Sequence, residues 1–233
     1  MESIWTRQRT AAPARETLSR DQIVKATMEL LDTEGLAGLS MRKLAARLDS
    51  GATSLYWHVQ TKDDLIDLVI DEVYGEIDVP DAELAGWRPG VLLFAHSLRA
   101  AVLRHGWLPE VIYTRPSIGP KAITLGTRGL ALFAAAGFSG RDTDYAMGSV
   151  MSLVLGLTSS EAVAQRTLRK AGQTAEEWTG EILAEAKQVT AEHPEMHESL
   201  RRRSAVDFAQ LQNEQFAYGL DSLLDGLEKR LTP

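Results

Sequence analysis

The chain of 233 residues contains no cysteine, so neither a disulfide framework nor a thiolate metal site is possible. This absence fits a reducing compartment, and we expect a cytoplasmic location. Long apolar runs are also missing, since no stretch approaches the ~20 apolar residues of a membrane span. Residues 1–7 lack the apolar core of a secretory signal. The sequence therefore predicts a protein that does not enter a membrane.

Signals for strands and for catalysis are equally scarce. Alternating β-branched runs are few and Asn-Gly hairpin turns are absent. There is no phosphate loop, nucleotide fingerprint or Ser-His-Asp order, and the histidines and carboxylates are scattered. His193 and His197 lie four residues apart, but Pro194 interrupts them, so we expect a solvated loop there. We predict that the protein is not an enzyme and has no cofactor and no metal site.

The net charge of −7 is unevenly distributed along the chain. Residues 1–62 hold nine Lys and Arg against seven Asp and Glu, whereas the remainder holds 16 against 25. The first part is therefore slightly basic and the rest strongly acidic. Because an acidic surface cannot lie along a phosphate backbone, any contact with DNA belongs to the first part.

Helical periodicity runs through almost the whole chain, which predicts an all-α fold. A capping box at Ser19 begins the first helix, and Gly35 is expected to end it. Ser40 can cap a second helix, and a third covers 52–59 after the short break at 49–51. Two short helices joined by such a turn are typical of a helix-turn-helix.

These signals suggest three parts of the chain. Residues 1–18 form a basic, flexible arm, which either touches DNA or is only a disordered terminus. Residues 19–77 form the helix-turn-helix domain, with a fourth helix that Thr61 caps. Residues 87–230 form a helical body, in which 166–203 is a polar segment that we expect to be mobile. The body helices are expected at 88–105, 108–113, 119–136, 142–166, 174–191 and 205–230.

Two of the body helices are unusually apolar. Each has a stripe wide enough to face both its own core and a second subunit, which favours a helix-bundle dimer interface. The alternative is that both are ordinary buried helices of a monomer. The stripes comprise Met147, Val150, Met151, Val154, Leu155 and Leu157 in one helix and Phe208, Leu211, Phe216, Leu220, Leu223, Leu224 and Leu227 in the other.

Two segments of the helix-turn-helix domain, which we call the head, resemble a known protein family. Residues 39–48 (LSMRKLAARL) and 53–59 (TSLYWHV) resemble the DNA-binding head of the tetracycline-repressor (TetR) family over about residues 18–77. The body is more weakly similar to the tetracycline-repressor C-terminal domain, for example at 98–104 and 216–220. The resemblance implies a homodimeric transcriptional regulator, usually a repressor, with a three-helix head and a body that binds a small-molecule effector and forms the dimer.

The resemblance also implies which residues contact double-stranded DNA. A recognition helix lays its N-terminal residues against base edges in the major groove. The tetracycline repressors carry Gln-Pro where this chain has Ala52-Thr53, so the operator should differ, by ~1–3 kcal/mol of discrimination for each lost contact. Asp49 stands where the family usually has Gly, but Asp tolerates the left-handed region. The candidate DNA contacts are Arg42, Ala52, Thr53, Tyr56, Trp57, His58 and Lys62, although Tyr56 and Trp57 could simply cover a small core.

The effector site departs further from the tetracycline repressors. When Thr114-Arg115-Pro116 is aligned with their Thr-Arg-Pro run, their metal-binding histidine falls on Ile112, which cannot bind magnesium. We therefore expect a largely apolar effector in a cavity between body helices. The alternatives are a repressor that responds to a tetracycline–magnesium chelate and a DNA-binding protein without an effector. The candidate lining residues are Ile77, Phe94, Leu98, Trp107, Ile112, Tyr113, Phe133, Met147 and Met151, with His96 and His105 as possible polar contacts.

Overall fold

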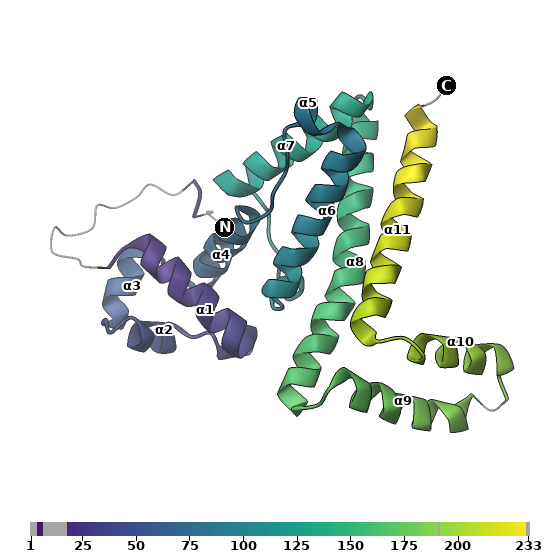
Figure 1. Cartoon of the computed structure of the whole chain (residues 1–233). Helices are drawn as coiled ribbons and strands as arrows, with labels where there is room; N and C mark the ends of the chain where they lie inside the picture. Colours follow the sequence, from purple (N-terminus) through teal and green to yellow (C-terminus); the bar gives the residue numbers. More distant parts are fainter. Residues whose placement is uncertain (1–3, 7–17, 191, 232–233) are drawn as a thin grey trace. The chain divides into compact units, whose positions relative to one another are not determined.

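A computed structural model describes residues 4–6, 18–190 and 192–231 of the chain. The described residues contain helices and no strand, which confirms the all-α prediction (Figure 1). Almost all of the predicted arm, residues 1–18, lies outside them. The chain divides into two compact units, residues 1–148 and 149–233, and α8 runs through the boundary.

The first unit contains the predicted helix-turn-helix and the first body helices. Helices α1, α2 and α3 pack in sequence, α4 packs on both α1 and α7, and α6 packs on α7. The core of the head is formed by fully buried aliphatic side chains such as Ile23, Leu44 and Leu55. The elements are α1 (Arg20–Gly38), α2 (Met41–Arg47), α3 (Ala52–His58), α4 (Lys62–Tyr74), α5 (Ala82–Ala85), α6 (Trp87–Arg104), the 3-10 helix η1 (Leu108–Glu110), α7 (Pro120–Ala136) and the start of α8 (Arg141–Ala171).

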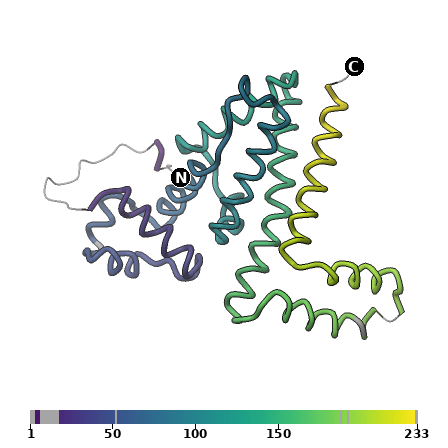
Figure 2. The backbone as a smooth tube through the Cα atoms, viewed as in Figure 1, coloured from purple at the N-terminus to yellow at the C-terminus, as the bar shows by residue number. Residues whose placement is uncertain are grey.

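The second unit consists of the rest of α8 with α9 (Ala175–Val189), α10 (Pro194–Ser204) and α11 (Phe208–Leu231). Gly219 of α11 faces α8, because a Cβ there would lie 3.4 Å from side-chain atoms of Leu153 and Leu157. Helices α9 and α10 pack together and connect the end of α8 to α11 (Figure 2). The described helix α8 is also long and apolar enough to cross a membrane, but the core helix of a soluble protein passes the same test.

Several helix boundaries differ from the predicted ones. Gly35 has φ 70° and ψ −176°, so it breaks α1, but helical structure resumes and continues to Gly38. The helix expected at 108–113 is only a 3-10 turn, Leu108–Glu110. The expected loop around Pro194 is wrong, since proline at a first helical position costs no hydrogen bond and begins α10. The segment 166–203 is therefore largely helical.

The turn between α2 and α3 is formed as predicted. Asp49 has φ 48° and is the non-glycine residue with positive φ among those described. Ser40 accepts a hydrogen bond from the Lys43 amide at 3.2 Å, so α2 begins at its predicted cap. The turn thus uses a left-handed residue to reverse the chain before the recognition helix.

Replacing Asp49 tests this turn. Because a β-branched residue is disfavoured in the left-handed region, Asp49→Val is expected to lower the free energy of unfolding by ~1–2 kcal/mol. Asp49→Gly, which tolerates the same backbone, should be neutral or slightly stabilising. Urea unfolding followed by circular dichroism measures both. Equal stability of the two variants would contradict the role given to this turn.

Candidate DNA-binding head and effector region

Helix α3 presents two large aromatic side chains to solvent. It begins after the turn, and Leu55 and Val59 bury its inner face completely. Tyr56 is 49% exposed and Trp57 is 50% exposed, so neither merely covers the core of the head. Thr53, at the start of the helix, is also exposed, whereas His58 at its end is half-buried. The helix therefore offers groups that can enter a groove.

The basic residues of the head that were considered as DNA contacts differ in their surroundings. Arg42 on α2 is exposed. The Lys62 ammonium group donates to the carbonyl of Leu36 at 3.2 Å, which ties the start of α4 to the end of α1. Arg47 lies 2.9 Å from Glu29, consistent with a solvated surface pair rather than a DNA contact.

Helix α4 belongs to the head but carries acidic groups that reach the body. Its start is fixed by a capping box, in which Thr61 accepts from the Asp64 amide at 3.0 Å and Asp64 accepts from the Thr61 amide at 3.2 Å. Asp67, one turn further, forms a bidentate pair with the Arg115 guanidinium. The hydrogen bond with Asp67 raises the pKa of Arg115, so the guanidinium stays charged.

Asp71 makes a second connection between α4 and the body. Its carboxylate is buried and accepts hydrogen bonds from the backbone amides of Ala122 at 2.9 Å and Lys121 at 3.4 Å. These amides lie in the first turn of α7, whose own cap residue, Gly119, has no side chain to offer. Asp71 therefore caps α7 from another helix, where a negative charge also suits the helix dipole.

A tyrosine adds a hydrogen bond at the same junction between α4 and α7. The Tyr74 hydroxyl lies 2.8 Å from the Ser117 hydroxyl, in the segment that precedes α7. Burial raises the pKa of Tyr74, so the hydroxyl remains neutral and keeps this hydrogen bond. Asp67, Asp71 and Tyr74 thus each attach α4 to residues 115–122.

Most of the candidate effector residues are buried in the first unit. Phe94, Leu98 and Phe133 are fully buried, while Ile112 is 5% exposed. The thioether of Met147, at the start of α8, lies over Gly129, where a Cβ would come within 2.8 Å of its methyl carbon. The remaining candidates in this unit are Ile77 and Trp107, both buried, and Tyr113.

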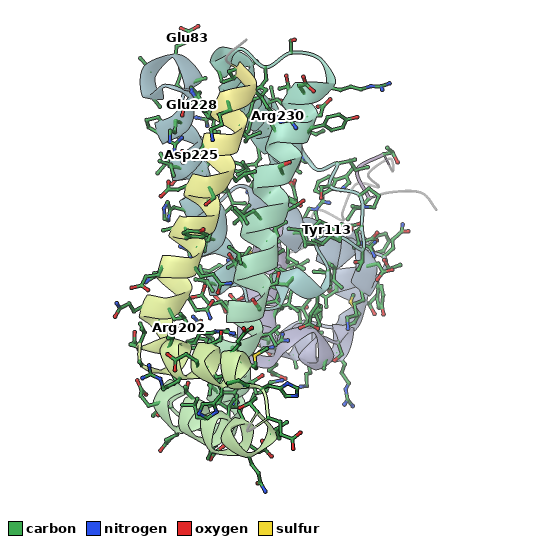
Figure 3. All side chains as sticks on the ribbon, turned by 90° about the vertical axis from the view of Figure 1, so that its right-hand side faces the viewer. Glu83, Tyr113, Arg202, Asp225, Glu228 and Arg230 are labelled. Atoms are coloured by element: carbon green, nitrogen blue, oxygen red, sulfur yellow. The ribbon has the colours of Figure 1, made fainter. Side chains whose placement is uncertain are left out.

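Two candidates do not share this environment. Tyr113 is 71% exposed in the turn after η1, and its side chain is labelled in Figure 3. Met151 is half-buried and belongs to the second unit. Among the polar candidates, His96 is exposed and His105 is buried. No group of three or more His, Asp or Glu side chains in the described segments is arranged to hold a metal ion.

An open cavity of about 250 Å³ lies between the end of α4 and α7. Its apolar wall is formed by Ile77, Val79 and Leu125, and Lys121 and Arg128 add positive charge. Lys121 is paired with Glu72 at 2.6 Å. Of the predicted effector residues, Ile77 lines this cavity.

Two family models match the chain on either side of this junction. Residues 23–69 match the model for bacterial regulatory proteins of the tetR family, and residues 79–231 match the tetracyclin repressor-like C-terminal domain. The chain belongs to the TetR family. It is accordingly a transcriptional regulator and not an enzyme.

Relatives within the TetR family support this assignment over the full length. The chain is 33% identical over 232 residues to the transcriptional repressor DrrR1 of Streptomyces coeruleorubidus, covering 98% of this chain and 84% of that protein. A regulator from Saccharopolyspora erythraea is 42% identical over 161 residues, covering 69% of this chain and 68% of its own. The class D tetracycline repressor from Escherichia coli is 32% identical, covering 92% and 91%.

Solved structures of TetR-family proteins have the same fold. ActR of Streptomyces coelicolor in complex with actinorhodin superposes with a TM-score of 0.77 at 27% identity, covering 94% of this chain and all of that one. ActR has also been solved without ligand, with the same TM-score. The predicted architecture, a helix-turn-helix head followed by a helical ligand-binding domain, is thereby confirmed.

The contacts that join head and body were not found from the sequence. Asp67, Asp71 and Glu76 were not singled out from the sequence, and Arg115 was considered only as part of an aligned run. One signal was available, because Asp67 and Asp71 lie four residues apart within 65–74, where Glu72 is the only other charged residue. A buried carboxylate on such a helix needs a partner.

Proposed function

We propose that this protein is a ligand-responsive repressor that binds a palindromic operator as a homodimer and is released by a largely apolar small molecule. The observation that carries the proposal is the attachment of α4 to the body through Asp67 and Asp71. Asp67 pairs with Arg115, and Asp71 caps α7, so a movement of residues 115–122 must move the helix that follows the recognition helix. Binding of the ligand then weakens the affinity for DNA, and binding of DNA weakens the affinity for the ligand, with a coupling free energy of typically ~1–3 kcal/mol.

The operator contacts are assigned to the exposed face of the head. The seven candidates named from the sequence remain our proposal, with Thr53, Tyr56 and Trp57 entering the major groove. Arg42 and Lys62 would contact phosphates, and Lys62 would exchange its bond to the Leu36 carbonyl for one to DNA. Since Ala52 and Thr53 replace Gln-Pro, the operator is expected to differ from that of the tetracycline repressors.

The dimer is assigned to α8 and α11. Their buried residues, such as Val154, Leu220 and Leu224, occupy the inner side of the second unit. Tyr218 on α11 is 78% exposed and Val163 on α8 is 45% exposed, so apolar surface remains on these two helices for a second copy. A homodimer would place two heads ~34–36 Å apart, the spacing of successive major grooves.

The effector is assigned to the buried apolar residues of the body. Ile112 supplies no oxygen or nitrogen ligand for magnesium, which argues against a tetracycline chelate even though the chain is 32% identical to a tetracycline repressor. ActR, at 27% identity, has been solved with the ligand actinorhodin, and this supports an organic effector of another kind. We also propose that the protein is cytoplasmic.

A gel-shift experiment tests the proposed function. DNA from upstream of the protein's own gene and its neighbours should be retarded at a stated salt concentration. The complex should be released by an apolar aromatic compound and not by tetracycline with magnesium. Release by the chelate would favour the tetracycline alternative, and tight binding that no compound changes would favour a regulator without an effector. Size-exclusion chromatography with light scattering should give twice the 25.6 kDa chain mass.

A further inference from the structure

A buried histidine joins the end of α6 to α1 and to the segment that follows α4. The His105 side chain is 3% exposed, yet each ring nitrogen faces a carboxylate oxygen. Nδ1 lies 2.8 Å from Asp32 in α1, and Nε2 lies 3.1 Å from Glu76, which follows α4. Only the protonated imidazolium carries a hydrogen on both nitrogens and can donate to both carboxylates at once.

The surrounding side chains complete a small network, which we call the His105 cluster: Asp32, Glu76, Arg104, His105 and Trp107. The Trp107 indole donates to the same Asp32 oxygen at 2.7 Å, and its ring lies 5.9 Å from that of His105. Arg104, the last residue of α6, pairs with Glu76. Two carboxylates and one guanidinium carry a net charge of −1, so the cluster is neutral only when His105 is charged.

The titratable groups that face His105 therefore come from three elements. They are Asp32 from α1, Glu76 from the segment after α4, and Arg104 from α6 by way of Glu76. Burial lowers the pKa of His105 and is the largest single influence, but the hydrogen bonds and charges of Asp32 and Glu76 together outweigh it. The pKa is raised above the ordinary value of 6.5.

We propose that the His105 cluster is a proton-dependent latch between head and body: the imidazolium holds α1 and the end of α4 against the end of α6, and its deprotonation loosens the head. A neutral ring has a single N–H, so one carboxylate loses its hydrogen bond and the two acids face each other with less compensation. The latch goes beyond the proposed function, because it requires neither an effector nor an operator.

The pH dependence follows from linkage. A histidine whose pKa is raised by folding stabilises the folded state fully below its unfolded value, near 6.5. That contribution is lost as the pH rises through the higher folded value. The latch is therefore closed in mildly acidic solution and opens as the pH rises through the raised pKa of His105.

Histidine NMR of the full-length protein gives the first test. His105 should titrate with a midpoint above 6.5, and Asp32→Asn, which keeps the shape of the side chain but removes its charge, should move this midpoint downward. A midpoint at or below 6.5, or one that Asp32→Asn leaves unchanged, would overturn the proposal. The signal of His105 is assigned by its loss in His105→Gln. The matched control is His96→Gln, because His96 is an exposed histidine on α6.

Hydrogen exchange gives the second test, and it also measures the head. After correction for intrinsic rates, the amides around Asp32 should exchange ~10-fold faster near pH 8.5 than near pH 6 in the wild type and in His96→Gln. In His105→Gln the exchange should be fast at both pH values. If the amides around Asp32 are equally protected at the two pH values in the wild type, the proposal is wrong. If His105→Gln fails to fold, Asp32→Asn still tests the proposal. In this variant the amide exchange around residue 32 must accelerate at a lower pH than in the wild type.

Discussion

Gly119→Ala is expected to lower the free energy of unfolding by about 2–4 kcal/mol and to detach α7 from α4. Gly119 is buried directly before α7, and a methyl group on it would overlap the Asp71 carboxylate and approach the Trp5 ring. The carboxylate cannot yield without giving up its bonds to the amides of Lys121 and Ala122. The substitution should therefore combine overpacking with the loss of a helix cap.

A glycine on the same helix provides the matched control. A Cβ on Gly126 would have nothing within 4 Å, so Gly126→Ala should stabilise the protein by ~0.5–1 kcal/mol through helix propensity alone. Asp71→Ala separates the two effects, since it removes the cap without the clash and should cost ~1–2 kcal/mol. Urea unfolding followed by circular dichroism measures all three. Similar stabilities for Gly119→Ala and Gly126→Ala would show that Asp71 does not hold α7.

The same variants bear on the proposed coupling. If Asp71 transmits the movement of α7 to α4, Asp71→Ala should still bind the operator but need more effector for release. Gly126→Ala should respond like the wild type. An unchanged effector response in Asp71→Ala would assign the coupling to the other polar contacts between α4 and residues 115–122, such as the Asp67–Arg115 pair and the Tyr74–Ser117 hydrogen bond. That outcome is distinct from a protein that responds to no compound.

Local features of the fold were predictable from the sequence because they depend on neighbouring residues. The caps at Ser19, Ser40 and Thr61 each involve a residue three positions away, and the left-handed Asp49 needs only its own backbone. Pro194 was misread because proline ends a helix from inside but favours a first position, and the two cases look alike in a polar segment. The TetR resemblance added the order of the domains.

The contacts that join head and body could not be predicted in this way. Asp67 and Arg115 are 48 residues apart, Asp71 and Ala122 are 51 apart, and Asp32 and His105 are 73 apart. Helical periodicity reports which face of a helix is buried, not which distant residue it meets. The resemblance directed attention to the apolar effector residues instead, so His105 was considered only as a possible ligand contact.

Trp57→Ala is expected to reduce operator affinity by ~10- to 100-fold, which corresponds to about 1–3 kcal/mol. The ring is half exposed on α3 and stands beside Tyr56, so its removal deletes contact area with DNA while leaving the core formed by Leu55 intact. Thermal stability should therefore change little. Leu93→Ala on α6 removes a side chain with the same 50% exposure and should bind the operator like the wild type. Fluorescence anisotropy with a labelled operator measures both.

The salt dependence of binding distinguishes this aromatic contact from a phosphate contact. Trp57→Ala should leave the slope of log K against log salt unchanged, because no charge is lost. Lys62→Ala should reduce that slope by ~1 if Lys62 exchanges the Leu36 carbonyl for a phosphate. If the slope does not change, Lys62 acts within the head, holding the start of α4 against the end of α1. The affinity of Trp57→Ala then decides whether α3 enters the groove, since a value within twofold of the wild type would contradict the assignment of this helix.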